Sequence, residues 1–139
     1  MFDTSDLTCA ATGNEDIIVS AYRQQLDSDD CRHRLWGYCL RIENNSAQRI
    51  RLLRKDLCVT DNNGKNFHDM SYGFHGELPD LEPGECFEFE DTALIDAAEA
   101  VLYGSCLACT ADGREFKINL PLIPLLSAKS NADFYSLLN

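Results

Sequence analysis

Residues 35–44 read LWGYCLRIEN, and this stretch decides the fold class. Large apolar side chains recur in it at every second position, as at Trp36, Tyr38 and Ile42. Side chains of an extended strand point alternately to its two faces, so aromatic and β-branched residues on alternate positions are typical of a half-buried strand. The stretch therefore predicts a β-strand with one face in the core.

The period of two continues on both sides of this stretch. Residues 50–60 alternate with a change of phase near Arg54 and Lys55, which predicts a β-bulge or two short strands. Other alternating runs place on one face Ile17, Val19 and Ala21; Phe87 and Phe89; Leu102, Gly104, Cys106 and Ala108; and Phe116, Ile118 and Leu120. These runs predict further short strands along most of the chain.

Turn residues separate the runs. Residues 61–64 (DNNG), 82–85 (EPGE) and 112–113 (DG) contain the glycine, proline and Asx residues that tight turns need. Short strands interrupted by turns, with little helical periodicity, predict an all-β fold, an antiparallel β-sandwich of about seven strands.

Two weak helical patterns remain. Residues 93–100 would form one or two turns between strands, and residues 130–138 would form a short C-terminal helix, in which Ser130 and Asp133 fit a capping box. We expect the chain to divide into an N-terminal tail (1–14), one sandwich domain (15–126) and a C-terminal extension (127–139).

Composition narrows the function. The chain has 139 residues and a net charge of −11, so a nucleic acid is not the expected partner, because phosphate contacts need lysines and arginines. No apolar run is long enough to cross a membrane, and the acidic N-terminus lacks the features of a signal peptide. We therefore expect a cytoplasmic protein that does not insert into membranes.

The charges are unevenly distributed along the chain. Seven of the twelve basic residues lie within residues 32–55, whereas residues 66–113 contain eleven acids and no Lys or Arg. One interpretation is that the two parts neutralise each other within the domain. The other is that a bipolar surface orients a binding partner.

The cysteines follow no disulfide-scaffold or zinc-knuckle spacing. Seven are present, an odd number, and in a reducing compartment they are expected to be free thiols. Cys106 and Cys109 form a C-x-x-C motif, but residues three apart on a strand point to opposite faces. The motif therefore does not predict a redox or metal site.

The order of these features resembles the ApaG family over residues 16–126. The resemblance rests on the strand 35–44, the turn 61–64, the Pro83-Gly84-Glu85 turn, the Gly104 strand and the segment 112–121. It implies an immunoglobulin- or fibronectin-type-III-like sandwich with no assigned enzymatic activity. Bacterial members are linked to cobalt resistance and magnesium efflux. Eukaryotic members occur in an F-box protein and a polymerase-delta-interacting protein, which implies protein–protein recognition.

The chain departs from the family pattern at several points. The family's glycine-rich loop reads G-x-G-x-x-G, and here Ser71 replaces its first glycine. Cys106 stands where the family favours an aromatic residue, two positions after the glycine of its late strand. The tail after Leu126 is also longer than usual. The loop substitution weakens any function that depends on three glycines.

The glycine loop is the predicted partner-binding segment. Its residues are Ser71, Tyr72, Gly73, Phe74, His75 and Gly76. A phosphate site would need a helix to begin after the loop, but Pro79 and Pro83 follow closely and the segment is acidic. The aromatic side chains and the histidine make the loop a candidate recognition tip for a protein.

A metal site is the alternative. His68, Asp69 and His75 stand close in sequence and offer nitrogen and oxygen ligands to a divalent ion. No nucleophile elbow, P-loop or metalloprotease motif is present. We therefore predict a non-catalytic module without a cofactor that binds a protein, with a homodimer through a sheet edge or face as one form. The alternative is a protein that binds or senses a divalent metal.

Overall fold

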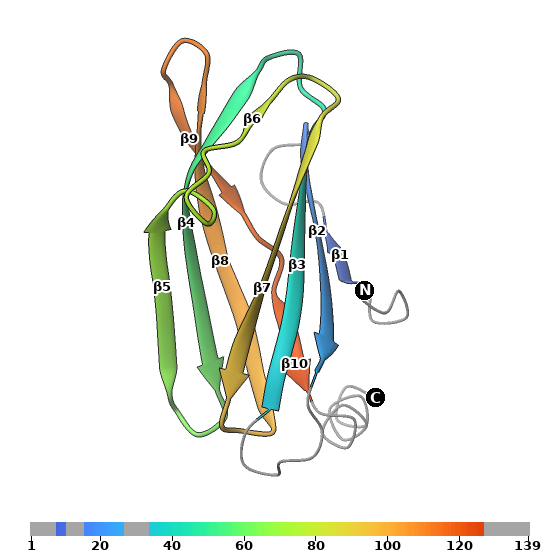
Figure 1. Ribbon diagram of the computed structural model, residues 1–139, viewed down its shortest axis with the longest axis vertical. Helices are drawn as coiled ribbons and strands as arrows, with labels where there is room; N and C mark the ends of the chain where they lie inside the picture. The colour runs from blue at the N-terminus through green and yellow to red at the C-terminus, as the bar shows by residue number, and fades with distance from the viewer. Residues whose placement is uncertain (1–7, 11–15, 27–33, 127–139) are drawn as a thin grey trace.

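The computed structural model describes residues 8–10, 16–26 and 34–126, and in these ranges it contains strands and no helix (Figure 1). The strands form two antiparallel sheets. The four-stranded sheet has the order β1 (Thr8–Ala10), β2 (Ile17–Gln25), β3 (Arg34–Asn44), β7 (Cys86–Ile95). The six-stranded sheet has the order β10 (Ile123–Leu126), β8 (Glu99–Thr110), β4 (Ile50–Asp61), β5 (Asn66–Tyr72), with β6 (Asp80–Leu81) beside β4 and β9 (Glu115–Asn119) beside β8. The predicted all-β sandwich is confirmed.

The strand count differs from the prediction of about seven, because the described residues form ten strands. The strands that alternation did not single out are β1, β5, β6 and β10. Three of these have only two to four residues, and β5 has no buried residue at all. A strand of either kind shows no clear apolar alternation, since that pattern needs a buried face of some length.

The core lies between the two sheets. Trp36, Tyr38, Leu40 and Ile42 of β3 are all buried, as the sequence predicts. β8 packs closely against β4 at Gly104, whose φ is +150° and where an added Cβ would lie 2.0 Å from the carbonyl oxygen of Asp56. The glycine therefore permits an approach that no other residue allows.

The predicted bulge in β4 is confirmed and has a consequence for the site. The pairing of β4 with β8 shifts register between Leu52 and Arg54. After the shift Leu57 and Val59 point into the core, and Lys55, which has the same parity, is buried with them. The bulge thus turns a lysine inward.

The helical prediction for residues 93–100 is wrong. Residues 93–95 complete β7, residues 96–98 form a bend, and β8 begins at Glu99. Because β7 and β8 belong to different sheets, this short connection crosses between the layers and buries Ala97 and Ala100, so packing overrides the weak helix propensity.

The predicted segments outside the domain fall only partly within the described residues. β1 lies within the predicted tail and pairs with β2, so residues 8–10 belong to the sheet. The predicted C-terminal helix lies outside the described residues. Within the described ranges, no helix has the length and apolar character needed to cross a bilayer.

Candidate functional site at the open edge between β5 and β7

The two long sides of the sandwich differ. On one side β10 contacts β2. On the other side β5 and β7 are edge strands, and among the described residues each is paired with a single neighbour, β4 or β3 (Figure 1). A cleft of about 350 Å³ lies between these edges. Unpaired strand edges are surfaces on which another chain can bind.

A buried lysine on β4 lies between the two edge strands. Lys55 is 5% exposed, and its Nζ lies 3.2 Å from Asp69 Oδ2 and 3.9 Å from Asp91 Oδ2. The same Nζ lies 4.3 Å from the centre of the Phe89 ring. A buried ammonium is stable only when it is paired, and here β5 and β7 each supply one carboxylate. The lysine thereby links the two edge strands.

Two carboxylates of the cleft, Asp69 and Asp91, act on the buried hydroxyl of Tyr38. Burial raises the pKa of the Tyr38 hydroxyl, and the charges of Asp91 and Asp69 raise it further. The phenol therefore stays protonated and is not a base at neutral pH.

The cleft combines these charges with apolar surface. Leu57, Val59 and Leu102 form its floor. Phe67 on β5 and Leu94 on β7 lie at its rim and are 65% and 64% exposed. Large apolar side chains at the rim of a cleft are typical of a binding surface.

The glycine loop lies at one end of β5 and is partly core. Phe74 is 1% exposed, and its ring packs edge-on against Phe87 and Phe89 at centroid distances of 5.4 Å and 5.3 Å. A Cβ on Gly73, where φ is +74°, would lie 2.7 Å from the Glu77 carbonyl oxygen. The phenylalanine is thus a core residue and is not part of a recognition tip.

Other residues of the loop remain accessible. Tyr72 is 79% exposed, and the exposed His75 stacks on Phe89 with ring centres 4.8 Å apart. His75 adopts φ of 52°, next to Gly76 at 84°. Ser71 lies within β5 and has no positive φ, so replacing the family's glycine there causes no backbone strain. Strands follow this loop within the described residues, and no helix begins that would hold a phosphate.

The structure does not bring the predicted metal ligands together. Asp69 points inward to Lys55, and His75 Nε2 lies 3.8 Å from Asp91. His68 points to the outer face of the sheet, where its Nε2 contacts Asp56. Because neighbouring residues of a strand face opposite sides, His68 and Asp69 cannot share an ion.

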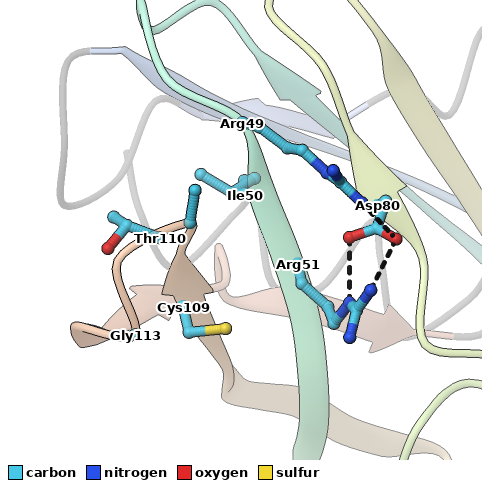
Figure 2. Close-up of a pocket in the computed structure, with 8 residues that line it drawn as sticks. Arg49, Ile50, Arg51, Asp80, Cys109, Thr110 and Gly113 are labelled. Atoms are coloured by element: carbon cyan, nitrogen blue, oxygen red, sulfur yellow. Dashed lines mark hydrogen bonds and ion pairs between the residues drawn. The ribbon is translucent and has the colours of Figure 1, made fainter.

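A second pocket, of about 300 Å³, is lined by two arginines (Figure 2). Asp80 bonds Arg51 through both oxygens at 2.9 Å and pairs with Arg49 at 3.0 Å. Hydrogen bonds from Arg51 and Arg49 lower the pKa of Asp80 to about 2. Both arginines therefore already pair with a carboxylate of the same chain. Of the two interpretations of the uneven charge, neutralisation within the domain describes this pocket.

The C-x-x-C motif behaves as the sequence predicts. Cys106 is fully buried, and burial raises its pKa to about 12, whereas Cys109 lies on the other face and lines the arginine pocket. Cys39, Cys58, Cys86, Cys106 and Cys109 are free thiols.

Sequence reasoning missed the residues that build the cleft, although the signals were present. Lys55 has the parity of Leu57 and Val59, which places it inward once the bulge is recognised. Asp91 likewise continues the parity of Phe89. Alternation gave no sign that β5 was a strand, and so no sign that Phe67 and Asp69 face the cleft.

Known proteins resemble the chain over most of its length. The sequence profile of the ApaG domain, DUF525, matches residues 24–108. Protein ApaG of Rhizobium leguminosarum bv. trifolii is 30% identical over 118 residues, covering 84% of this chain and 90% of that protein. Protein ApaG of Sinorhizobium fredii is 31% identical with the same coverage.

Solved structures agree on the fold. An X-ray structure of a structural genomics target superposes with a TM-score of 0.78 at 20% identity, covering 85% of this chain and 92% of that one. At this identity the likeness concerns the arrangement of the strands.

Proposed function

The chain belongs to the ApaG domain family, and from this premise we propose that it is a non-catalytic module that binds a protein partner in the cleft between β5 and β7. The observation that carries the proposal is the open edge itself. Within the part of the chain that the structure describes, two strand edges without a pairing partner flank a cleft whose rim exposes Phe67 and Leu94. His75 of the glycine loop lies beside Asp91, which lines the cleft, and would extend the contact surface.

The charges at the cleft indicate the kind of partner. Asp69 and Asp91 share the single ammonium of Lys55, so one negative charge is left over. Residues 66–113, which include β5 and β7, contain no Lys or Arg. We therefore expect a partner segment that presents an apolar side chain beside a Lys or Arg, in an extended conformation that can pair with a strand edge.

The absence of catalysis is part of the proposal. Lys55 is held by two carboxylates, Tyr38 is kept protonated, and Cys106 is a buried thiol. None of these groups is poised as a base or a nucleophile. We place the module in the cytoplasm, where reducing conditions keep its described cysteines as thiols.

The family link to cobalt resistance and magnesium efflux enters the proposal through the partner. A module without activity of its own influences cation levels by binding a protein that senses or transports the ion. The alternative, direct metal binding by His68, Asp69 and His75, is not favoured. His68 and Asp69 lie on opposite faces of β5, and His75, in the loop after β5, lies beside Asp91.

The test is affinity capture followed by measurement with the purified partner. Leu94→Asp should weaken the complex at least about tenfold, because it places a charge on apolar contact surface. Leu122→Asp is the matched control, since Leu122 is 66% exposed but lies in a different groove. Both variants should keep the stability of the parent.

Three results would count against the proposal. If Leu94→Asp and Leu122→Asp lowered the affinity for the partner equally, the cleft would not be the binding site. If the affinity for the partner did not change with salt concentration, charge attraction would not contribute to binding. A concentration-dependent homodimer that Leu94→Asp dissociates would show that the occupant is a second copy of the chain.

A further inference from the structure

Three side chains with donor atoms of the kind that ligate metals meet on the outer face of the six-stranded sheet, away from the cleft. Asp56 and Cys58 alternate on β4, and His68 on β5 is the register partner of Cys58. One donor atom from each of the three lies within 4.8 Å of the other two. Opposite and diagonal positions on one face of a sheet are within reach of each other, so the register itself assembles the cluster.

We propose that Asp56, Cys58 and His68 form a mononuclear site for a zinc-class divalent ion. A thiolate, an imidazole and a carboxylate are the donor set that Zn²⁺ and Co²⁺ accept, whereas Mg²⁺ requires oxygen ligands. The Cys58 thiol loses its proton to solvent when the ion binds. The site is independent of partner binding at the cleft, because no residue is shared between them.

The surroundings suit a site with three protein ligands. Asp56 and Cys58 line a groove of about 400 Å³ together with Tyr103, Ser105 and Lys117. Three protein ligands leave one position of a tetrahedral ion for water, and this groove gives water access. The close approach of β8 at Gly104 holds the backbone of Asp56 in place.

A second cluster on the chain shows what makes this one distinctive. Cys39, Glu88 and Glu90 also lie within 4.8 Å of one another, on the outer face of the other sheet. There Glu88 is bonded to Arg41 at 2.9 Å, and burial with the two carboxylates raises the pKa of Cys39 to about 11. That cluster has no imidazole, and the carboxylate of Glu88 is already paired with an arginine. In the Asp56 cluster the contact is between two of the donors themselves, His68 and Asp56, and both side chains can ligate one ion.

The experiment is a titration of the metal-free, reduced full chain with Co²⁺, followed by displacement with Zn²⁺. We expect one Co²⁺ per chain and a sulfur-to-cobalt charge-transfer band in the near ultraviolet. Cys58→Ser should abolish the band, and His68→Ala and Asp56→Asn should weaken affinity at least about tenfold. Excess Mg²⁺ should not displace the ion.

Two matched controls make the result specific. Cys109→Ser removes a thiol of similar exposure on the same face of the sheet, and His75→Ala removes another exposed imidazole. Both should bind Co²⁺ as the parent does. A band that survives in Cys58→Ser, or is lost in Cys109→Ser, overturns the proposal, as does the absence of stoichiometric binding.

NMR spectroscopy tests the site with all three proposed ligands intact, and so does not depend on whether Cys58→Ser folds. Bound Co²⁺ is paramagnetic and broadens the NMR signals of the imidazole that holds it. Sub-stoichiometric Co²⁺ should broaden the signals of His68 and leave those of His75 sharp. The chain has three histidines, and their signals are assigned with His33→Ala and His75→Ala. Equal broadening of both imidazoles, or broadening of His75 alone, overturns the site.

Discussion

The two faces of β5 differ although they belong to one seven-residue strand. The inner row is Phe67, Asp69 and Ser71. Phe67 and Asp69 line the cleft, and Asp69 pairs there with the buried Lys55. The outer row, which includes His68 and Tyr72, faces outward, and His68 contacts Asp56. Asp69 thus binds a buried charge that links two strands, whereas His68 joins a cluster on the outside of the sheet.

The difference shows that residues adjacent in a strand belong to opposite surfaces of the sheet. His68 and Asp69 are adjacent in the chain but take part in different interactions, whereas Asp56 and His68, twelve positions apart, are in contact. Substitutions on the inner side should therefore change stability, and substitutions on the outer side should leave stability nearly unchanged.

The largest difference is expected between Phe74→Ala and Tyr72→Ala, which compare the buried side chain of the loop after β5 with an exposed side chain of the outer row. Removing the Phe74 ring leaves a cavity against Phe87 and Phe89, which should lower the free energy of unfolding by about 3–5 kcal/mol. Tyr72 is exposed, so its replacement should cost less than about 0.5 kcal/mol. Urea denaturation measures both values. Equal losses would mean that the loop packs differently.

Lys55→Met is expected to have an intermediate effect. Methionine keeps the packing of the stem but leaves Asp69 and Asp91 without their cation. Loss of one partner from a fully buried pair costs about 3–5 kcal/mol, and the partial exposure of both carboxylates reduces this to about 1–2 kcal/mol.

The control for Lys55 is Lys65→Met. Lys65 makes an exposed pair with Asp96 at 3.1 Å, so its loss should fall within about 0.5 kcal/mol of the parent in the same urea titration. If Lys65→Met cost as much as Lys55→Met, burial would not be what distinguishes the inner lysine.

Asp80→Asn should have the smallest effect and one that depends on pH. The pKa of Asp80 is lowered to about 2 in the folded chain, against about 3.9 when unfolded. The stabilisation is therefore present above about pH 4 and is lost as pH falls toward 2. Thermal melts should show a small deficit of the variant at about pH 6 that shrinks toward pH 2. A deficit that grows on acidification would contradict the assignment.

Alternation predicted the parts of the fold that have a buried face. β3 and the bulge in β4 follow from residues 35–44 and from the phase change at Lys55, because strand geometry alone sets which side chains share a face. The edge strand β5 could not be found in this way, since none of its residues is buried. The glycine loop was predicted as a partner-binding segment with Tyr72, Phe74 and His75 at its tip, although Phe74 fills the core.

The sequence by itself determined that this chain forms short strands with one apolar face each, and that Cys106 and Cys109 point apart. Both are local consequences of a two-residue repeat in an extended backbone. Only the tertiary structure decided that Lys55 meets Asp69 and Asp91, and that Asp56 and Cys58 meet His68. Those contacts depend on strand partners and register between distant segments, which are set by how the two sheets pack as a whole.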